Sequence, residues 1–67
     1  MKNQALAGRE VIIEFYPVGN LVRVAAMDVV SLTEISIQGP KNASEDTLKG
    51  NALKRLEYVL RKKGIID

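Results

Sequence analysis

The side chains able to do chemistry in this sequence are carboxylates, hydroxyls and amines, because the chain has no histidine and no cysteine. The commonest general base, the thiol nucleophile and the usual zinc ligands are therefore missing. Glu10 and Glu14 share one face of a predicted strand. Four residues at about 3.3 Å each separate them by about 13 Å, beyond the spacing of a glycosidase carboxylate pair. We interpret both as exposed strand residues.

The hydroxyl side chains have no sequence context typical of a nucleophile. Ser31, Ser36 and Ser44 lie in no nucleophile-elbow pattern. Residues 39–44 lead into a predicted helix N-terminus, where phosphate can bind, but they lack the P-loop spacing and are followed by two acidic residues. The sequence therefore predicts no catalytic residue, no metal ligand, no cofactor site and no small-molecule substrate. We expect a protein that is not an enzyme.

Length and composition indicate one small domain. The chain has 67 residues, of which 46% are hydrophobic and 27% charged, a globular composition with room for one core. Without cysteine, stability must come from packing or self-association, and a cytoplasmic location is favoured. No apolar run approaches the roughly 20 residues that span a bilayer. We expect a flexible N-terminus over residues 1–8, a single domain over residues 9–65 and no membrane partner.

Alternating residues predict two paired strands over residues 10–16 and 21–27. Gly19 and Asn20 suit a two-residue type I′ turn between them. Counting outward from that turn gives the same register as the hydrophobic pattern does. The register pairs Val18 with Leu21, Tyr16 with Arg23, Phe15 with Val24, Glu14 with Ala25, Ile13 with Ala26 and Ile12 with Met27. One face then collects Val11, Ile13, Phe15, Val22, Val24 and Ala26.

Residues 33–38 alternate again and predict a third strand, which ends at Gly39-Pro40 because proline donates no ladder hydrogen bond. The loop before this strand contains Val29, Val30 and Leu32, which are poor turn residues. We expect something to cover them.

From residue 45 to about residue 63 the period changes to that of a helix. Its apolar stripe comprises Leu48, Ala52, Leu53, Leu56, Val59 and Leu60. Ser44 is the expected N-cap, with Asn42 as the alternative. Gly64 suits a left-handed residue after the helix, followed by Ile65 folding back in a Schellman motif. The predicted fold class is therefore α+β, a three-stranded antiparallel β-meander followed by one C-terminal α-helix packed on one sheet face.

Several short sequence segments, taken in order along the chain, resemble those of a known family. They are Glu14-Phe15, Val18-Gly19-Asn20, Val22-Arg23-Val24, Met27-Asp28, residues 33–37, Gly39-Pro40 and residues 53–60. Over about residues 9–63 the chain resembles a family of short uncharacterised proteins from alphaproteobacteria, a domain of unknown function. The resemblance implies no activity, ligand or site residue. That family typically has Thr-Gly-Thr at the second turn, where this chain has Ser31-Leu32-Thr33.

One helix covers only one face of a three-stranded sheet, so the register leaves the other face bare. The predicted interface on that face comprises Ile12, Tyr16, Val18, Leu21 and Met27. A second copy that stacks on this face, or pairs with a strand edge, would bury it, and we predict a homodimer. The alternative is a monomer in which Arg23 lies over Tyr16 and scattered apolar residues are tolerated.

Positive charge is concentrated in the predicted helix. Residues 49–63 contain one acidic residue, Glu57. They contain six basic residues, namely Lys49, Lys54, Arg55, Arg61, Lys62 and Lys63. Charge segregated in this way suits a polyanionic partner, and a solvated helix face explains it equally well. The alternative function is weak nucleic-acid binding, with an acidic protein as another partner that would fit. The predicted polyanion contacts are Lys54, Arg55, Arg61 and Lys62.

Overall fold

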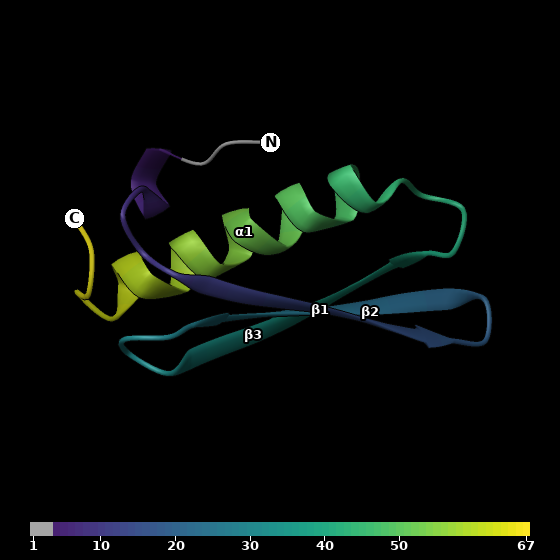
Figure 1. Cartoon of the computed structure of the whole chain (residues 1–67), viewed down its shortest axis with the longest axis horizontal. Coiled ribbons are helices and arrows are strands. Elements are labelled where there is room, and N and C mark those ends of the chain that lie inside the picture. Colours follow the sequence, from purple (N-terminus) through teal and green to yellow (C-terminus); the bar gives the residue numbers. More distant parts are fainter. Residues whose placement is uncertain (1–3) are drawn as a thin grey trace.

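The structure, a computed structural model, describes residues 4–67 of the chain (Figure 1). Its elements are the 3-10 turn η1 (Gln4–Leu6), the strands β1 (Val11–Val18), β2 (Leu21–Asp28) and β3 (Thr33–Pro40), and the helix α1 (Glu45–Lys62). The strands form one antiparallel sheet in the order β1-β2-β3, and α1 packs across one face of it against β2 and β3. The predicted meander with a C-terminal helix on one sheet face is confirmed.

The first hairpin has the predicted register. Val18 pairs with Leu21 across the turn, and every pair from there to Ile12 with Met27 is as predicted. Gly19 has a φ of 60°, a conformation that glycine adopts without the clash that a Cβ atom would cause. The turn and the apolar alternation therefore act together to place one set of side chains toward the helix.

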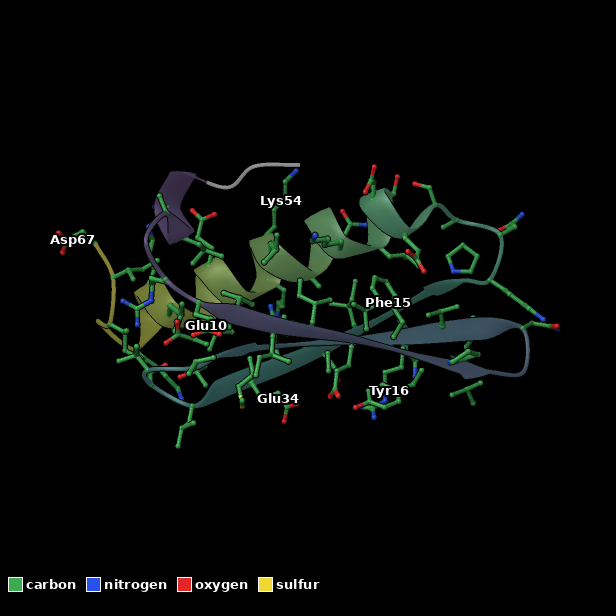
Figure 2. All side chains as sticks on the ribbon, in the orientation of Figure 1. Glu10, Phe15, Tyr16, Glu34, Lys54 and Asp67 are labelled. Carbon is green, nitrogen blue, oxygen red and sulfur yellow. The ribbon has the colours of Figure 1, made fainter. Side chains whose placement is uncertain are left out.

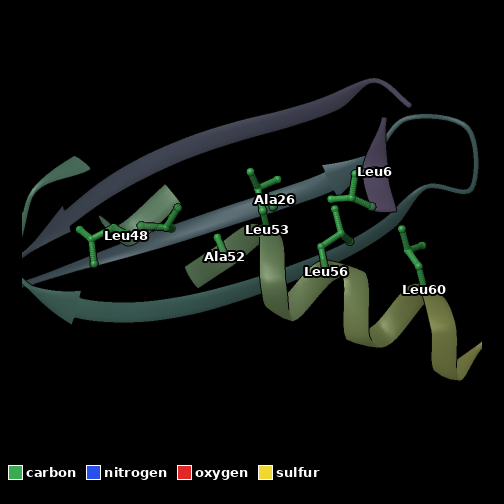
Figure 3. Packing of buried hydrophobic residues seen from close by; sticks show 8 residues of the cluster. Leu6, Ala26, Leu48, Ala52, Leu53, Leu56 and Leu60 are labelled. Atoms are coloured by element: carbon green, nitrogen blue, oxygen red, sulfur yellow. The ribbon is translucent and has the colours of Figure 1, made fainter. Parts of the chain in front are cut away.

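The core lies between α1 and the centre of the sheet (Figure 3). Its buried members are Leu6, Val24, Ala26, Leu48, Ala52, Leu53, Leu56 and Leu60. At the start of the helix, a Cβ atom added to Gly39 would lie 2.2 Å from Cδ2 of Leu48. The absence of a side chain at Gly39 is therefore what lets α1 approach β3 so closely.

Both ends of α1 are capped as the sequence predicts. The Ser44 hydroxyl accepts a hydrogen bond of 3.1 Å from the Thr47 amide, so Ser44, and not Asn42, is the N-cap. Gly64 has a φ of 76°, and the Ile65 amide donates to the Leu60 carbonyl at 2.9 Å, which is the Schellman pattern. Ile65 then packs against the core.

The expected flexible N-terminus covers residues 1–8, and the structure describes its second part. Residues 1–3 lie outside the described residues, but Gln4–Leu6 form η1, and Leu6 is only 6% exposed. The Leu6 carbonyl accepts a hydrogen bond of 3.0 Å from the Arg9 amide. Leu6 lies at the same end of the core as Leu56 and Leu60 (Figure 3), and burying its side chain there offsets the loss of backbone freedom.

The connection between β2 and β3 exposes two of the apolar residues that we expected to be covered. Val30 is 79% exposed and Leu32 is 70% exposed, so no described part of the chain covers them. Leu32 is the one described non-glycine residue with a positive φ, at 60°. A leucine there has its Cβ close to its own backbone carbonyl oxygen, so this loop is locally strained.

Candidate functional site

The five residues of the predicted interface all lie on the sheet face away from α1. Figure 2 shows Tyr16 and Glu34 on this bare face and Phe15 on the helix side, as the register requires. Ile12 is 46% exposed, Val18 61% and Leu21 44%, while Met27 is half-buried. We call this surface the bare sheet face.

The apolar residues of the bare sheet face form two groups at its opposite ends. Ile12 pairs with Met27 near the start of β1, and Val18 pairs with Leu21 beside the first turn. Leu21 also faces Pro40, which extends the second group onto β3. Within the described chain no side chain covers either end, so both are open to a partner.

A polar cluster separates the two apolar ends. The Tyr16 hydroxyl donates a hydrogen bond of 2.5 Å to Oε1 of Glu14. The Arg23 guanidinium carbon lies 4.6 Å from the centre of the Tyr16 ring, a cation–π distance. The hydrogen bond to the Glu14 carboxylate raises the pKa of Tyr16 above its ordinary value. The contact of Arg23 with Tyr16, which we expected for a monomer, is therefore present. It covers only the middle of the bare sheet face.

The predicted polyanion contacts lie on the exposed side of α1. Lys54 points away from the sheet in Figure 2, and Arg55, Arg61 and Lys62 are exposed as well. Arg61 is already engaged, because its Nη1 forms an ion pair with Glu57 and its Nε donates to the backbone carbonyl of Asp67 at 2.8 Å. The four cations are therefore not equivalent.

Tyr58 is a member of this basic surface that the charge pattern did not identify. Its exposed ring lies 5.3 Å from the guanidinium carbon of Arg55 and 5.8 Å from Nζ of Lys62. The sequence did contain a signal for this contact. Arg55 stands three residues before Tyr58 and Lys62 four residues after it, and residues at these spacings lie on the same side of a helix. The result is an aromatic ring flanked by two cations.

A second feature that the sequence patterns did not predict is a carboxylate network at the β2–β3 loop. Asp28 is fully buried and accepts two hydrogen bonds from the Arg9 side chain, at 2.9 Å and 2.8 Å. It also accepts from the amide and the hydroxyl of Ser31, at 3.0 Å and 2.6 Å. These bonds, those from Arg9 first, hold the pKa of Asp28 far below its usual range. With its oxygens fully engaged, Asp28 stabilises the loop and is not placed to react.

We also searched the described residues for metal-binding groups and for membrane-spanning helices. Among residues 4–67, no three acidic, histidine or cysteine side chains lie together as a metal-binding group. The helices of the same stretch are too short or too polar to cross a bilayer.

The fold and its surfaces define a small α+β domain with one helix-covered sheet face and one bare face. Residues 8–63 match the family model of DUF6898, a domain of unknown function, and the chain belongs to this family. The predicted resemblance to a domain of unknown function is thereby confirmed. Comparison with curated proteins found no match, and comparison with solved structures found none either.

Proposed function

We propose that this protein is a self-associating interaction module whose bare sheet face binds a second copy of the chain. The observation that supports this proposal is the clustering of exposed apolar side chains. Of the seven large hydrophobic residues that are exposed among residues 4–67, four lie on this face, namely Ile12, Tyr16, Val18 and Leu21. We further propose a cytoplasmic, bacterial setting, supported by the lack of cysteine and by the resemblance to alphaproteobacterial proteins.

The bare sheet face is self-complementary when the strands of the two copies run antiparallel. A two-fold axis then lays the Ile12 and Met27 end of each copy on the Val18 and Leu21 end of the other. The polar clusters meet in the middle, each with its charges already engaged. Strands running parallel would instead place Arg23 against Arg23 of the second copy, two like charges in contact. The antiparallel arrangement is therefore the one we propose.

The size of the face predicts a weak association. Strands of 8 residues in a three-stranded sheet span about 27 Å by about 14 Å, or roughly 400 Å². A stable interface of standard size buries about 800 Å² on each partner. We therefore expect a dimer that dissociates at micromolar concentration and re-forms as the concentration rises.

Light scattering across a concentration series tests this function. The double variant Val18→Ser with Leu21→Ser should lower the fraction of dimer, because it removes one apolar end of the bare sheet face. The matched control is Val30→Ser with Leu32→Ser, which removes two apolar side chains from the β2–β3 loop that are more exposed than Val18 and Leu21. A degree of association unchanged by the first variant, or lowered equally by the second, would contradict the proposal.

A second candidate function is supported by Tyr58 and its flanking cations, because basic surfaces with an exposed aromatic ring suit nucleic acid. We expect little binding at physiological salt, since the net charge is only +2. Replacing Lys54, Arg55, Arg61 and Lys62 by Gln should leave the fold intact. The test is titration with duplex and single-stranded DNA at several salt concentrations. Micromolar, salt-sensitive binding that this variant loses would place nucleic acid ahead of self-association.

A further inference from the structure

The two edges of the sheet are not equally protected. α1 packs on β2 and β3, and Leu48 contacts Gly39 on β3. α1 does not pack on β1 in the same way. The edge of β1 therefore lies outside the cover of the helix, and its inner side chains Val11, Ile13 and Phe15 are only half-buried.

The register identifies which backbone groups β1 presents at its free edge. The Val29 amide donates to the Glu10 carbonyl at 3.1 Å, which extends the β1–β2 ladder by one hydrogen-bonded pair. Such pairs alternate along an antiparallel ladder, so the even-numbered residues of β1 bond to β2. Val11, Ile13, Phe15 and Pro17 therefore direct their backbone outward. Pro17 has no amide hydrogen to present, as is typical of an edge strand.

We propose that β1 pairs antiparallel with β1 of a second copy, with Ile13 opposite Ile13 at the two-fold axis. This pairing is a surface distinct from the bare sheet face. It adds ladder hydrogen bonds at Val11, Ile13 and Phe15 of each copy, and leaves Pro17 beyond the paired residues. On the helix side it places Phe15 against Val11 of the other copy, which buries side chains that are half-buried in one copy alone.

Other registers are less favourable for electrostatic or hydrogen-bonding reasons. An axis at Glu14 places two carboxylates directly opposite each other, and an axis at Ile12 places Glu10 opposite Glu14. An axis at Phe15 places Pro17 opposite Ile13 and loses edge hydrogen bonds. With the axis at Ile13, Glu14 faces Ile12 and no like charges face each other.

The pairing has a consequence for the proposed function. It joins two sheets into one continuous six-stranded sheet with both helices on the same face. The two bare sheet faces then form a single surface of about 800 Å², the size of one side of a standard interface. Stacking through the bare faces would therefore join pairs of such dimers.

Cysteine crosslinking tests the register directly, because the chain has no cysteine of its own. In the double variant Ile12→Cys with Glu14→Cys, the new thiols of two copies face each other at a non-hydrogen-bonded pair, about 4.5 Å apart between Cα atoms. Mild oxidation should convert most of the chain to a covalent dimer on a non-reducing gel. The matched control, Ser36→Cys with Gln38→Cys, has the same spacing on the β3 edge and should stay monomeric. Equal crosslinking of both variants, or none in either, would overturn the proposal.

Hydrogen exchange of the unmodified protein gives a second test that needs no substitution. The amides of Val11, Ile13 and Phe15 should exchange more slowly as the protein concentration rises, while the outward amides of β3 should not change. Exchange at these β1 amides that is independent of concentration while the protein associates would overturn the pairing. Crosslinking that persists in a Val18→Ser, Leu21→Ser background would support edge pairing separately from stacking. Loss of stacking alone would contradict only the proposed function.

Discussion

The two connections of the sheet reach the same positive φ with different residues. Gly19 in the first turn and Leu32 in the second loop both have a φ of 60°. The first turn needs no support beyond its own residue types. The second is held by Asp28, whose backbone carbonyl accepts from the Leu32 amide at 2.8 Å and whose carboxylate binds Ser31 and Arg9. A loop can therefore take an unfavourable residue where tertiary hydrogen bonds impose its conformation.

The largest expected effect is at the carboxylate that holds the second loop. Asp28→Asn should lower the free energy of unfolding by about 2 to 3 kcal/mol, because an amide NH₂ would face a donor of Arg9 or Ser31 in a buried position. Denaturant unfolding at neutral pH measures this loss. Arg9→Gln is the control and should have a smaller effect, since the arginine side chain is partly exposed. Equal stability of Asp28→Asn and the unmodified protein would show that the network does not hold the loop.

Acid titration weakens the same network without a substitution. The folded-state pKa of Asp28 lies below its ordinary value of 3.8, so the unfolded chain takes up the proton first. The stability that the carboxylate contributes is therefore complete above about pH 5 and is lost progressively as the pH falls through 3.8 and below. Unfolding midpoints measured from about pH 6 to about pH 2 should show this loss. The Asp28→Asn variant should show a correspondingly shallower dependence, and identical slopes would contradict the assignment.

In the first turn, the expected effect comes from the residue type itself. Gly19→Val should lower the free energy of unfolding by about 1 to 2 kcal/mol, because a β-branched side chain resists a positive φ. Gly19→Asn should cost less, since asparagine tolerates this conformation. Chemical denaturation of both variants gives the comparison. A midpoint unchanged by valine would remove the basis for the turn and for the register counted from it.

The contrast between the connections also explains what the sequence was able to predict. The hairpin register, the Ser44 cap and the Gly64 motif followed from residue types within a few positions of each other. The pairing of Arg9 with Asp28 did not, because 19 positions separate the two residues and neither belongs to a periodic pattern.

The candidate surfaces also divide into features that local residue patterns predict and features that depend on tertiary packing. The alternation of side chains along a strand is enough to place Ile12, Val18 and Leu21 together on the bare sheet face. The position of α1 over β2 and β3 depends on how closely two elements pack, as at Gly39 and Leu48, and no period in the sequence encodes it. The unprotected edge of β1 follows from that position and is therefore visible only in three dimensions.

The smallest expected effect would make the second connection resemble the first. Leu32→Gly relieves a left-handed penalty of roughly 1 to 2 kcal/mol, against a loss of roughly 0.5 to 1 kcal/mol from the freer unfolded chain. The net expectation is a small gain of up to about 1.5 kcal/mol in the free energy of unfolding, since the exposed Leu32 side chain contributes little packing. Val30→Gly is the matched control, because Val30 is just as exposed but has no positive φ. It should be destabilised by about 0.5 to 1 kcal/mol. The free energies of unfolding of both variants can be measured by thermal or denaturant unfolding. A change in the same direction for both would show that Leu32 is not strained, and that the two connections differ in sequence alone.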